Sequence, residues 1–155
     1  MPVPTPEQLE KYEKLPFRIA GSIDGLTEAQ FHHKPAEGEW SIHEVLIHLA
    51  DSEMIGSHRL RKTIAEEHPT LQGYDEAAWA KNLAYQTQNR ELALDLFKAQ
   101  HLSTAALLRT LSPQQWERTA LHSENGEMSL YDIFLVYLDH GQLHLAQIER
   151  LNESF

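Results

Sequence analysis

The sequence predicts an all-α protein, an antiparallel four-helix bundle formed as a single domain of residues 1–155. Four long segments place apolar residues at the 3.6-residue period of a helix, and three of them begin at a capping motif. No segment shows the sustained apolar–polar alternation of a strand. The length of 155 residues is that of one ordinary domain with enough apolar content to bury a core.

The first two long helices are predicted from capping boxes, in which the cap residue and the third helical residue bond reciprocally. Thr5 and Gln8 form the first box, and its helix is expected to continue to Gly21. Ser41 and Glu44 form the second box, and its helix is expected to reach about residue 66.

The last two long helices complete the predicted bundle. One is expected over about residues 90–111, with Leu92, Leu96, Leu107 and Leu111 on one broad apolar face. The other follows the cap at Ser129 and continues to about residue 152. Its inward positions are expected to be Leu130, Ile133, Phe134, Tyr137, Leu138, Leu145, Ile148 and Leu151.

Shorter elements are expected between the long helices. Residues 27–34 and the segment after Ser112, which contains Trp116, each carry the start signal of a short helix. Residues 68–88 form a long connection with a weak helical pattern at 75–82. Asn125 and Gly126 mark a turn, because this dipeptide tolerates positive φ angles.

The charge balance argues against two classes of partner. The chain has 13 Lys and Arg against 23 Asp and Glu, a net charge of −10 with neutral His. Nucleic acids and anionic lipids need a basic face, so neither is an expected partner. The basic run 59–62 is expected to be a solvated helix face. The absence of cysteine excludes disulfides, thiolate metal sites and a thiol nucleophile carried by the chain itself.

The localisation expected from the sequence is the cytoplasm. Residues 1–6 show neither the basic nor the apolar region of a secretory signal. The longest apolar-looking stretch, residues 130–138, is too short to span a bilayer and is interrupted by polar residues.

The spacing of His140 and His144 suggests a metal site. Residues four apart in a helix lie on one face, one turn above the other, and two such imidazoles can share a divalent ion. Both fall on the apolar stripe of the last long helix. The spacing alone leaves open a second interpretation, in which both are core histidines with hydrogen-bond partners. Gly141 stands where a zinc peptidase of the HExxH type has its glutamate, so that class is not expected.

A third ligand must come from another helix, and His48 is the best candidate. It lies in line with Val45, Ser52 and Ile55 at the edge of the apolar face of its predicted helix. The other histidines are expected in first turns, loops or solvated surfaces: His32, His33, His43, His58, His68, His101 and His122.

The depths of these histidines predict the topology. His48 lies about 10 Å along its helix from Ser41, and His144 lies about 12 Å from the far end of its own helix, at 1.5 Å per residue. The two depths agree only if these helices run antiparallel, since parallel helices would place His144 about 22 Å along. We therefore expect an up-down-down-up bundle, with residues 68–88 as the long crossover between the second and third helices and the site nearer one end.

Two segments resemble signatures of a known family. Residues 40–53 (WSIHEVLIHLADSE) and residues 137–148 (YLDHGQLHLAQI) are similar to the two signatures of the DinB-like superfamily in spacing and order. The resemblance covers nearly the whole chain. It implies a four-helix bundle, frequently a homodimer, with a divalent-metal site formed by His48, His140 and His144.

The resemblance also implies an activity. Family members of known activity are transferases that use a low-molecular-weight thiol such as bacillithiol, mycothiol or glutathione. The expected function is therefore a metal-dependent thiol S-transferase acting on a small electrophile. A metal-dependent hydrolase and a non-catalytic metal-binding bundle are the alternatives. Zn²⁺ or Ni²⁺ fits a set of imidazole ligands, whereas Mg²⁺ and Ca²⁺ prefer oxygen.

Four residues near the predicted ligands are candidates for a catalytic role. For a hydrolase, Glu44, Asp51 or Glu53 could act as a base. Tyr137, one turn before His140, could line the cleft and donate to a substrate, or could simply pack in the core.

Overall fold

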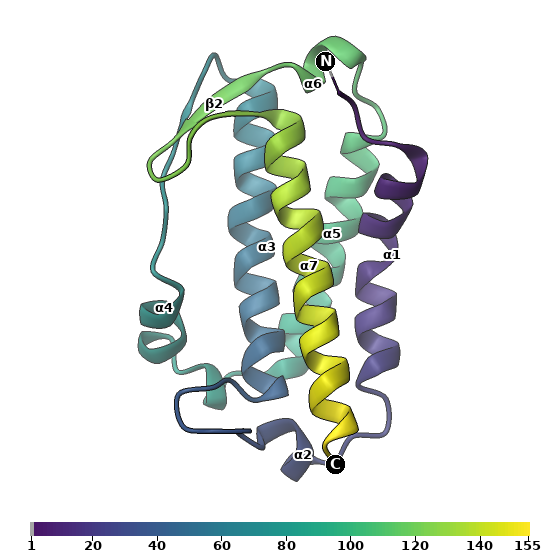
Figure 1. The fold of residues 1–155 in the computed structure, drawn as a ribbon, viewed down its shortest axis with the longest axis vertical. Helices are drawn as coiled ribbons and strands as arrows, with labels where there is room; N and C mark the ends of the chain where they lie inside the picture. Colours follow the sequence, from purple (N-terminus) through teal and green to yellow (C-terminus); the bar gives the residue numbers. More distant parts are fainter. Residues whose placement is uncertain (1) are drawn as a thin grey trace.

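Four long helices packed side by side form the protein in the computed structural model, which describes residues 2–155 (Figure 1). The helices are α1 (Pro6–Ser22), α3 (Ile42–Ala65), α5 (Arg90–Leu108) and α7 (Leu130–Glu153). The caps predicted at Thr5, Ser41 and Ser129 are present, each accepting a bond from the third helical residue. The predicted four-helix bundle is confirmed, and the third helix ends at Leu108, a little before its expected end.

The helices follow the predicted up-down-down-up order. In Figure 1, α1 and α7 run downward, and α3 and α5 run upward beside each other. The parallel pair α3 and α5 requires a long crossover, which contains α4 (Glu76–Asn82) and the 3₁₀ turn η1 (Tyr85–Thr87). The resulting antiparallel arrangement of α3 and α7 brings residues 92 positions apart in the sequence into contact, and this pair of helices carries the candidate site.

The part of the chain that the structure describes also contains a small sheet, which no alternation in the sequence indicated. Three short strands, β1 (Thr70–Leu71), β2 (Thr119–His122) and β3 (Gly126–Ser129), pair in the order β1-β2-β3. The β1–β2 pair is parallel and the β2–β3 pair is antiparallel. Strands of two to four residues are too short to show alternation, and the pairing of β1 depends on a partner far along the chain. Gly126 has a φ of 74° at the predicted turn.

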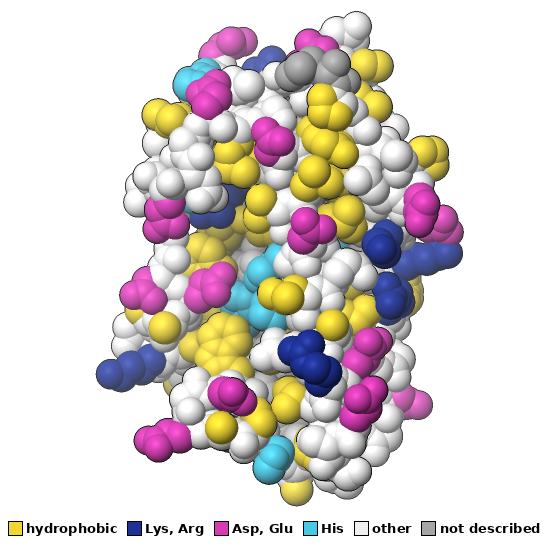
Figure 2. Space-filling view, in the orientation of Figure 1, with side chains coloured by type: hydrophobic (Ala, Val, Ile, Leu, Met, Phe, Trp, Pro, Cys, Tyr) yellow, Lys and Arg dark blue, Asp and Glu magenta, His cyan; other side chains and the backbone are white. Residues whose placement is uncertain are grey.

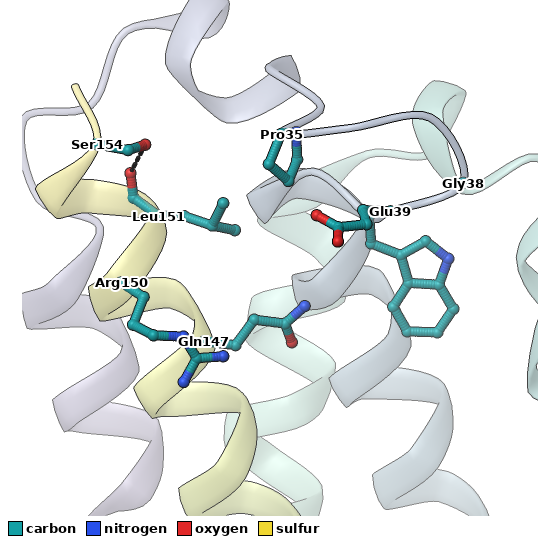
Figure 3. A pocket seen from close by; sticks show the side chains of 8 residues that line it. Pro35, Gly38, Glu39, Gln147, Arg150, Leu151 and Ser154 are labelled. Carbon is teal, nitrogen blue, oxygen red and sulfur yellow. Dashed lines mark hydrogen bonds between the residues drawn. The ribbon is translucent and has the colours of Figure 1, made fainter.

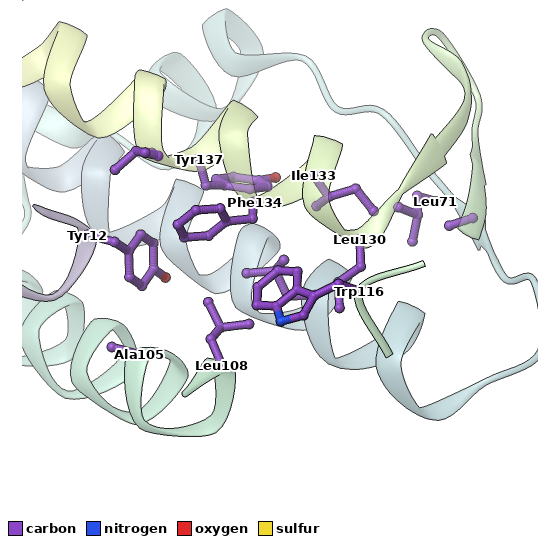
Figure 4. Close-up of a cluster of buried hydrophobic side chains, with 12 residues drawn as sticks. Tyr12, Leu71, Ala105, Leu108, Trp116, Leu130, Ile133, Phe134 and Tyr137 are labelled. Atoms are coloured by element: carbon purple, nitrogen blue, oxygen red, sulfur yellow. The ribbon is translucent and has the colours of Figure 1, made fainter. Parts of the chain in front are cut away.

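Two apolar clusters fill the bundle. One contains Tyr12, Leu108, Trp116 and Phe134, and Figure 4 shows these side chains converging from α1, α5, α6 (Pro113–Trp116) and α7. The other lies around Ile42 in the half near α2 (Glu28–His32). Among the described residues, no helix is long and apolar enough to cross a membrane.

The buried face of α5 differs from the predicted one. Leu92 and Leu96 are 67% and 43% exposed, whereas Phe97, His101 and Thr104 are buried. His101 and Thr104 can be buried because both have polar partners: His101 Nε2 lies 2.6 Å from the Tyr12 carbonyl oxygen, and Arg61 donates to Thr104 Oγ1. A pattern of apolar residues cannot identify a face that is buried through hydrogen bonds.

Candidate metal centre

Three histidines predicted as ligands meet between α3 and α7. His140 Nε2 lies 3.0 Å from His48 Nε2 and 3.0 Å from His144 Nε2. One ligand nitrogen from each of the three rings lies within 4.8 Å of the others. The structure thus brings together one residue of α3 and two of α7, as the antiparallel arrangement requires.

Local packing explains how the two helices come close enough. His48 lies in the second turn of α3, where every residue from Ser41 to Ala50 is buried. One turn beyond Ser52, Gly56 has no side chain, and a Cβ there would stand 2.6 Å from Cε1 of Tyr137. The ring of Tyr137 therefore packs directly on the backbone of α3, which holds α7 close beside His48.

Burial keeps the three rings neutral. Desolvation, with the two neighbouring imidazoles, lowers the pKa of His48 to about 3. Desolvation and then His144 lower the pKa of His140 to about 4. Burial also lowers the pKa of His144, against the opposing effects of Gln147 and of the Glu76 carboxylate. At neutral pH the cluster is therefore a set of uncharged imidazoles, the form that binds metals.

The hydrogen bonds around the cluster orient a nitrogen lone pair inward. His144 Nδ1 donates to Gln147 Oε1 at 2.8 Å, so its Nε2 is an acceptor facing His140. His48 Nδ1 is buried and has no hydrogen-bond partner among residues 2–155. His144 Nε2 carries no proton, and His140 Nε2 can hold only one proton for its two close contacts, with His144 and with His48. Neutral rings therefore cannot turn both contacts into good hydrogen bonds, whereas a cation between the nitrogens would attract every lone pair.

These donors fit a divalent ion. Tetrahedral zinc with bonds of 2.0–2.1 Å separates its ligand nitrogens by about 3.4 Å. The two contacts of 3.0 Å are within a few tenths of an ångström of that value. An all-imidazole set suits Zn²⁺ or Ni²⁺ and does not suit Mg²⁺ or Ca²⁺.

One side of the cluster is open. His48 is fully buried, but His140 and His144 are partly exposed. Figure 2 shows histidine side chains in cyan at the floor of a hollow, bordered by hydrophobic side chains. The ring of Trp40 lies 4.8 Å from that of His48 and forms part of the surroundings. A small molecule could therefore reach the nitrogen atoms from one side.

Two of the candidate bases are occupied elsewhere. Glu44 closes the capping box by accepting from the backbone nitrogen of Ser41, and it pairs with Lys34 at 3.1 Å. Asp51 accepts from the hydroxyl of Tyr85 at 2.7 Å. The contacts of both carboxylates are thus with groups outside the histidine cluster.

The other two candidates also have partners of their own. Glu53 is buried in the bundle, where it accepts from the hydroxyl of Tyr12 at 2.7 Å and lies 3.1 Å from His101 Nδ1. Tyr137 accepts from Arg59 Nη1 at 2.9 Å, and its ring centroid lies 6.5 Å from that of His140. Tyr137 packs in the core and borders the cluster, and its donation to a substrate stays a prediction.

Several polar residues that the sequence placed in solvent are buried. His101 lies in the core, His122 Nδ1 accepts from the backbone nitrogens of Glu124 and Asn125, and His43 Nε2 donates to the carbonyl of Tyr85. Each has a backbone partner, which removes most of the cost of burial. The basic run is not a fully solvated face either, because Arg59 bonds to Tyr137.

Sequence reasoning missed two residues that contact the cluster. Gln147 follows His144 by three residues, a spacing that places both on one helix face and that could have identified it. Trp40 lies just before α3, and its contact with His48 has no signal in the local sequence.

Two proteins of known sequence are similar to this chain over most of its length. A protein of Oceanobacillus iheyensis is 37% identical over 145 residues, covering 94% of this chain and 84% of its own length. YfiT of Bacillus subtilis is 31% identical over 151 residues, covering 94% of this chain and 85% of its own. The names of both describe, provisionally, metal-dependent hydrolases.

The solved structure of YfiT matches with a TM-score of 0.90 at 28% identity, covering 99% of this chain and 91% of that one. YfiT is a four-helix bundle of unusual topology. A mycothiol-dependent maleylpyruvate isomerase matches in fold alone, with a TM-score of 0.73 at 16% identity over 94% of this chain and 61% of its own. The family model of the DinB superfamily matches residues 12–148, and the chain belongs to this superfamily.

Proposed function

We propose that the protein is a metal-dependent hydrolase whose single divalent ion is bound by His48, His140 and His144. The convergence of three Nε2 atoms within one partly open cluster carries this proposal. The names of the two relatives support the reaction class. Three protein ligands leave a coordination position for water or substrate, which is the pattern of catalytic rather than structural zinc sites.

The chain contributes orientation and exclusion of water. An ion bound by three imidazoles supplies a Lewis acid that lowers the pKa of water towards neutrality. Gln147 keeps the proton of His144 on Nδ1 and so keeps its Nε2 free. Trp40 packs beside the ring of His48, and burial of that ring excludes solvent from the inner side.

The engagement of the three predicted bases by other groups favours a second candidate, a thiol-dependent S-transferase acting on a small electrophile. A hydrolase gains from a base that removes a proton from water. Glu44, Asp51 and Glu53 are each engaged by other partners, as described above. A thiol bound to a metal loses its proton readily without such a base, and in this cysteine-free chain the thiol would arrive as a cosubstrate.

Metal analysis and a substrate screen test the proposal. We expect about one zinc or nickel ion per chain in the purified protein, and loss of both the ion and the activity in His140→Ala. His58→Ala is a matched control, because His58 is an exposed residue of the same helix as His48. The screen should contain esters, amides and lactones without thiol, and chlorinated or epoxide compounds with and without thiol.

The outcomes separate the candidates. Turnover of the first group without thiol supports the hydrolase, and strictly thiol-dependent turnover of the second group supports the transferase. Stoichiometric metal with no turnover of either group indicates a non-catalytic metal-binding bundle.

A further inference from the structure

A pocket of about 490 Å³ opens between the last turns of α7 and the loop that precedes α3. Figure 3 shows Gln147, Arg150 and Leu151 on the α7 side, and Pro35 and Glu39 on the loop side. Trp40 also lines it. This volume falls within the range of pockets that bind small molecules.

Two residues that line the pocket also contact the histidine cluster. Gln147 lines the pocket and accepts the hydrogen bond from His144 Nδ1 at 2.8 Å. Trp40 lines the pocket and lies 4.8 Å from the ring of His48, measured between centroids. A molecule in the pocket is therefore separated from two of the three proposed ligands by a single side chain in each case.

The polar groups of the α7 side are donors. Because the oxygen of the Gln147 amide is used by His144, the amide nitrogen is left for a ligand. Arg150 follows Gln147 by three residues, so the two side chains leave the same face of α7, and Figure 3 shows both on that side of the pocket. Two neighbouring donors, one of them charged, form a recognition surface for a carboxylate.

The other lining residues restrict the ligand further. Trp40, Leu151 and Pro35 offer apolar surface beside these donors. Glu39 brings a negative charge to the opposite side, which disfavours a ligand with a second anionic group.

We propose that this pocket binds a small monocarboxylate, with its carboxylate on Arg150 and Gln147 and its apolar body against Trp40 and Leu151. The inference rests on the proposed function, since it assigns the substrate of the metal centre to the class of carboxylate-bearing small molecules. Binding in the pocket would place the rest of the molecule beside the histidine cluster.

Calorimetric titration with a matched pair of probes tests the pocket. Hippurate carries an aromatic ring and a carboxylate, and hippuramide replaces the carboxylate by a neutral amide. We expect the metal-free protein to bind hippurate at millimolar concentration or better and hippuramide more weakly. The metal-free protein is used because a carboxylate could otherwise coordinate an ion directly. Arg150→Gln should weaken hippurate binding about tenfold or more, since a charged hydrogen bond is lost.

Arg18→Gln is the control, because it removes the same charge from an arginine that donates to Gln142 outside the pocket. Hippurate affinity unchanged in Arg150→Gln, equal affinity for the two probes, or no binding of hippurate by the wild type would each overturn the proposal. The result is independent of turnover. Failure of every hydrolysis assay leaves selective binding of hippurate intact, and turnover of neutral esters without hippurate binding removes the pocket assignment alone.

Discussion

His101 Nδ1 lies 3.1 Å from Glu53 Oε2 in the middle of the bundle, where the two side chains are 1% and 5% exposed. The other nitrogen of His101, Nε2, faces the carbonyl oxygen of Tyr12 and must donate its proton there, because a carbonyl oxygen only accepts. Tyr12 completes the unit by donating from its hydroxyl to Glu53 Oε1.

This unit predicts strong coupling between Glu53 and His101. His101→Leu should lower the free energy of unfolding by about 3–5 kcal/mol, because it removes the imidazole that pairs with a buried carboxyl group. The double variant Glu53→Met/His101→Leu should lose less than the sum of the two single variants. Urea unfolding of the four proteins measures this. Additive losses would show that the two residues act independently.

A second prediction concerns Gln147 and its hydrogen bond to His144. Gln147→Met keeps the length of the side chain but removes the acceptor that holds the proton on Nδ1. We expect zinc affinity to fall about 10–100-fold, the usual effect of losing a partner of a ligand histidine. Competition with a chromophoric chelator measures the affinity. Gln142→Met is the control on the same helix, and an equal effect of both substitutions would refute the role of Gln147.

A third prediction is acid sensitivity of the metal-free protein. His140 has a folded-state pKa of about 4, below its ordinary value of 6.5. Between these values the unfolded chain binds more protons than the folded chain, so the stability contributed at neutral pH is lost as the pH falls from about 6.5 towards 4. The loss from this residue is roughly 3 kcal/mol. His140→Gln should flatten that part of the stability profile in urea unfolding, and a profile as steep as that of the wild type would contradict the assignment.

The parts of the fold that are encoded locally could be predicted from the sequence. Thr5, Ser41 and Ser129 predict the starts of their helices, because each cap bonds to a residue only three positions further along the chain. The depth of His48 and His144 along their helices predicted the topology, since a shared site requires level positions. The remaining features depend on partners distant in sequence. The pairing of β1 with β2, the burial of His101 against Tyr12 and the contact of Trp40 with His48 leave no local pattern.

The last prediction is the homodimer expected from the resemblance to the family. Leu92 and Leu96 lie one turn apart on the exposed face of α5 and give a surface on which to test it. Between them and α3 lies a shallow groove of about 220 Å³ that Ala50 and Ala93 also line. A second copy of the chain packing there would bury both leucines, which stabilises association by about 25 cal/mol for each Å² of apolar surface removed from water.

We expect light scattering at micromolar concentration to give the mass of a dimer for the wild type. Leu92→Glu should give a monomer with unchanged helix content, because the substitution places a charge in the interface. The control Leu143→Glu, at an exposed leucine of α7, should stay dimeric. A monomeric wild type would contradict the dimer, and a dimeric Leu92→Glu variant would exclude this face of α5 as its interface.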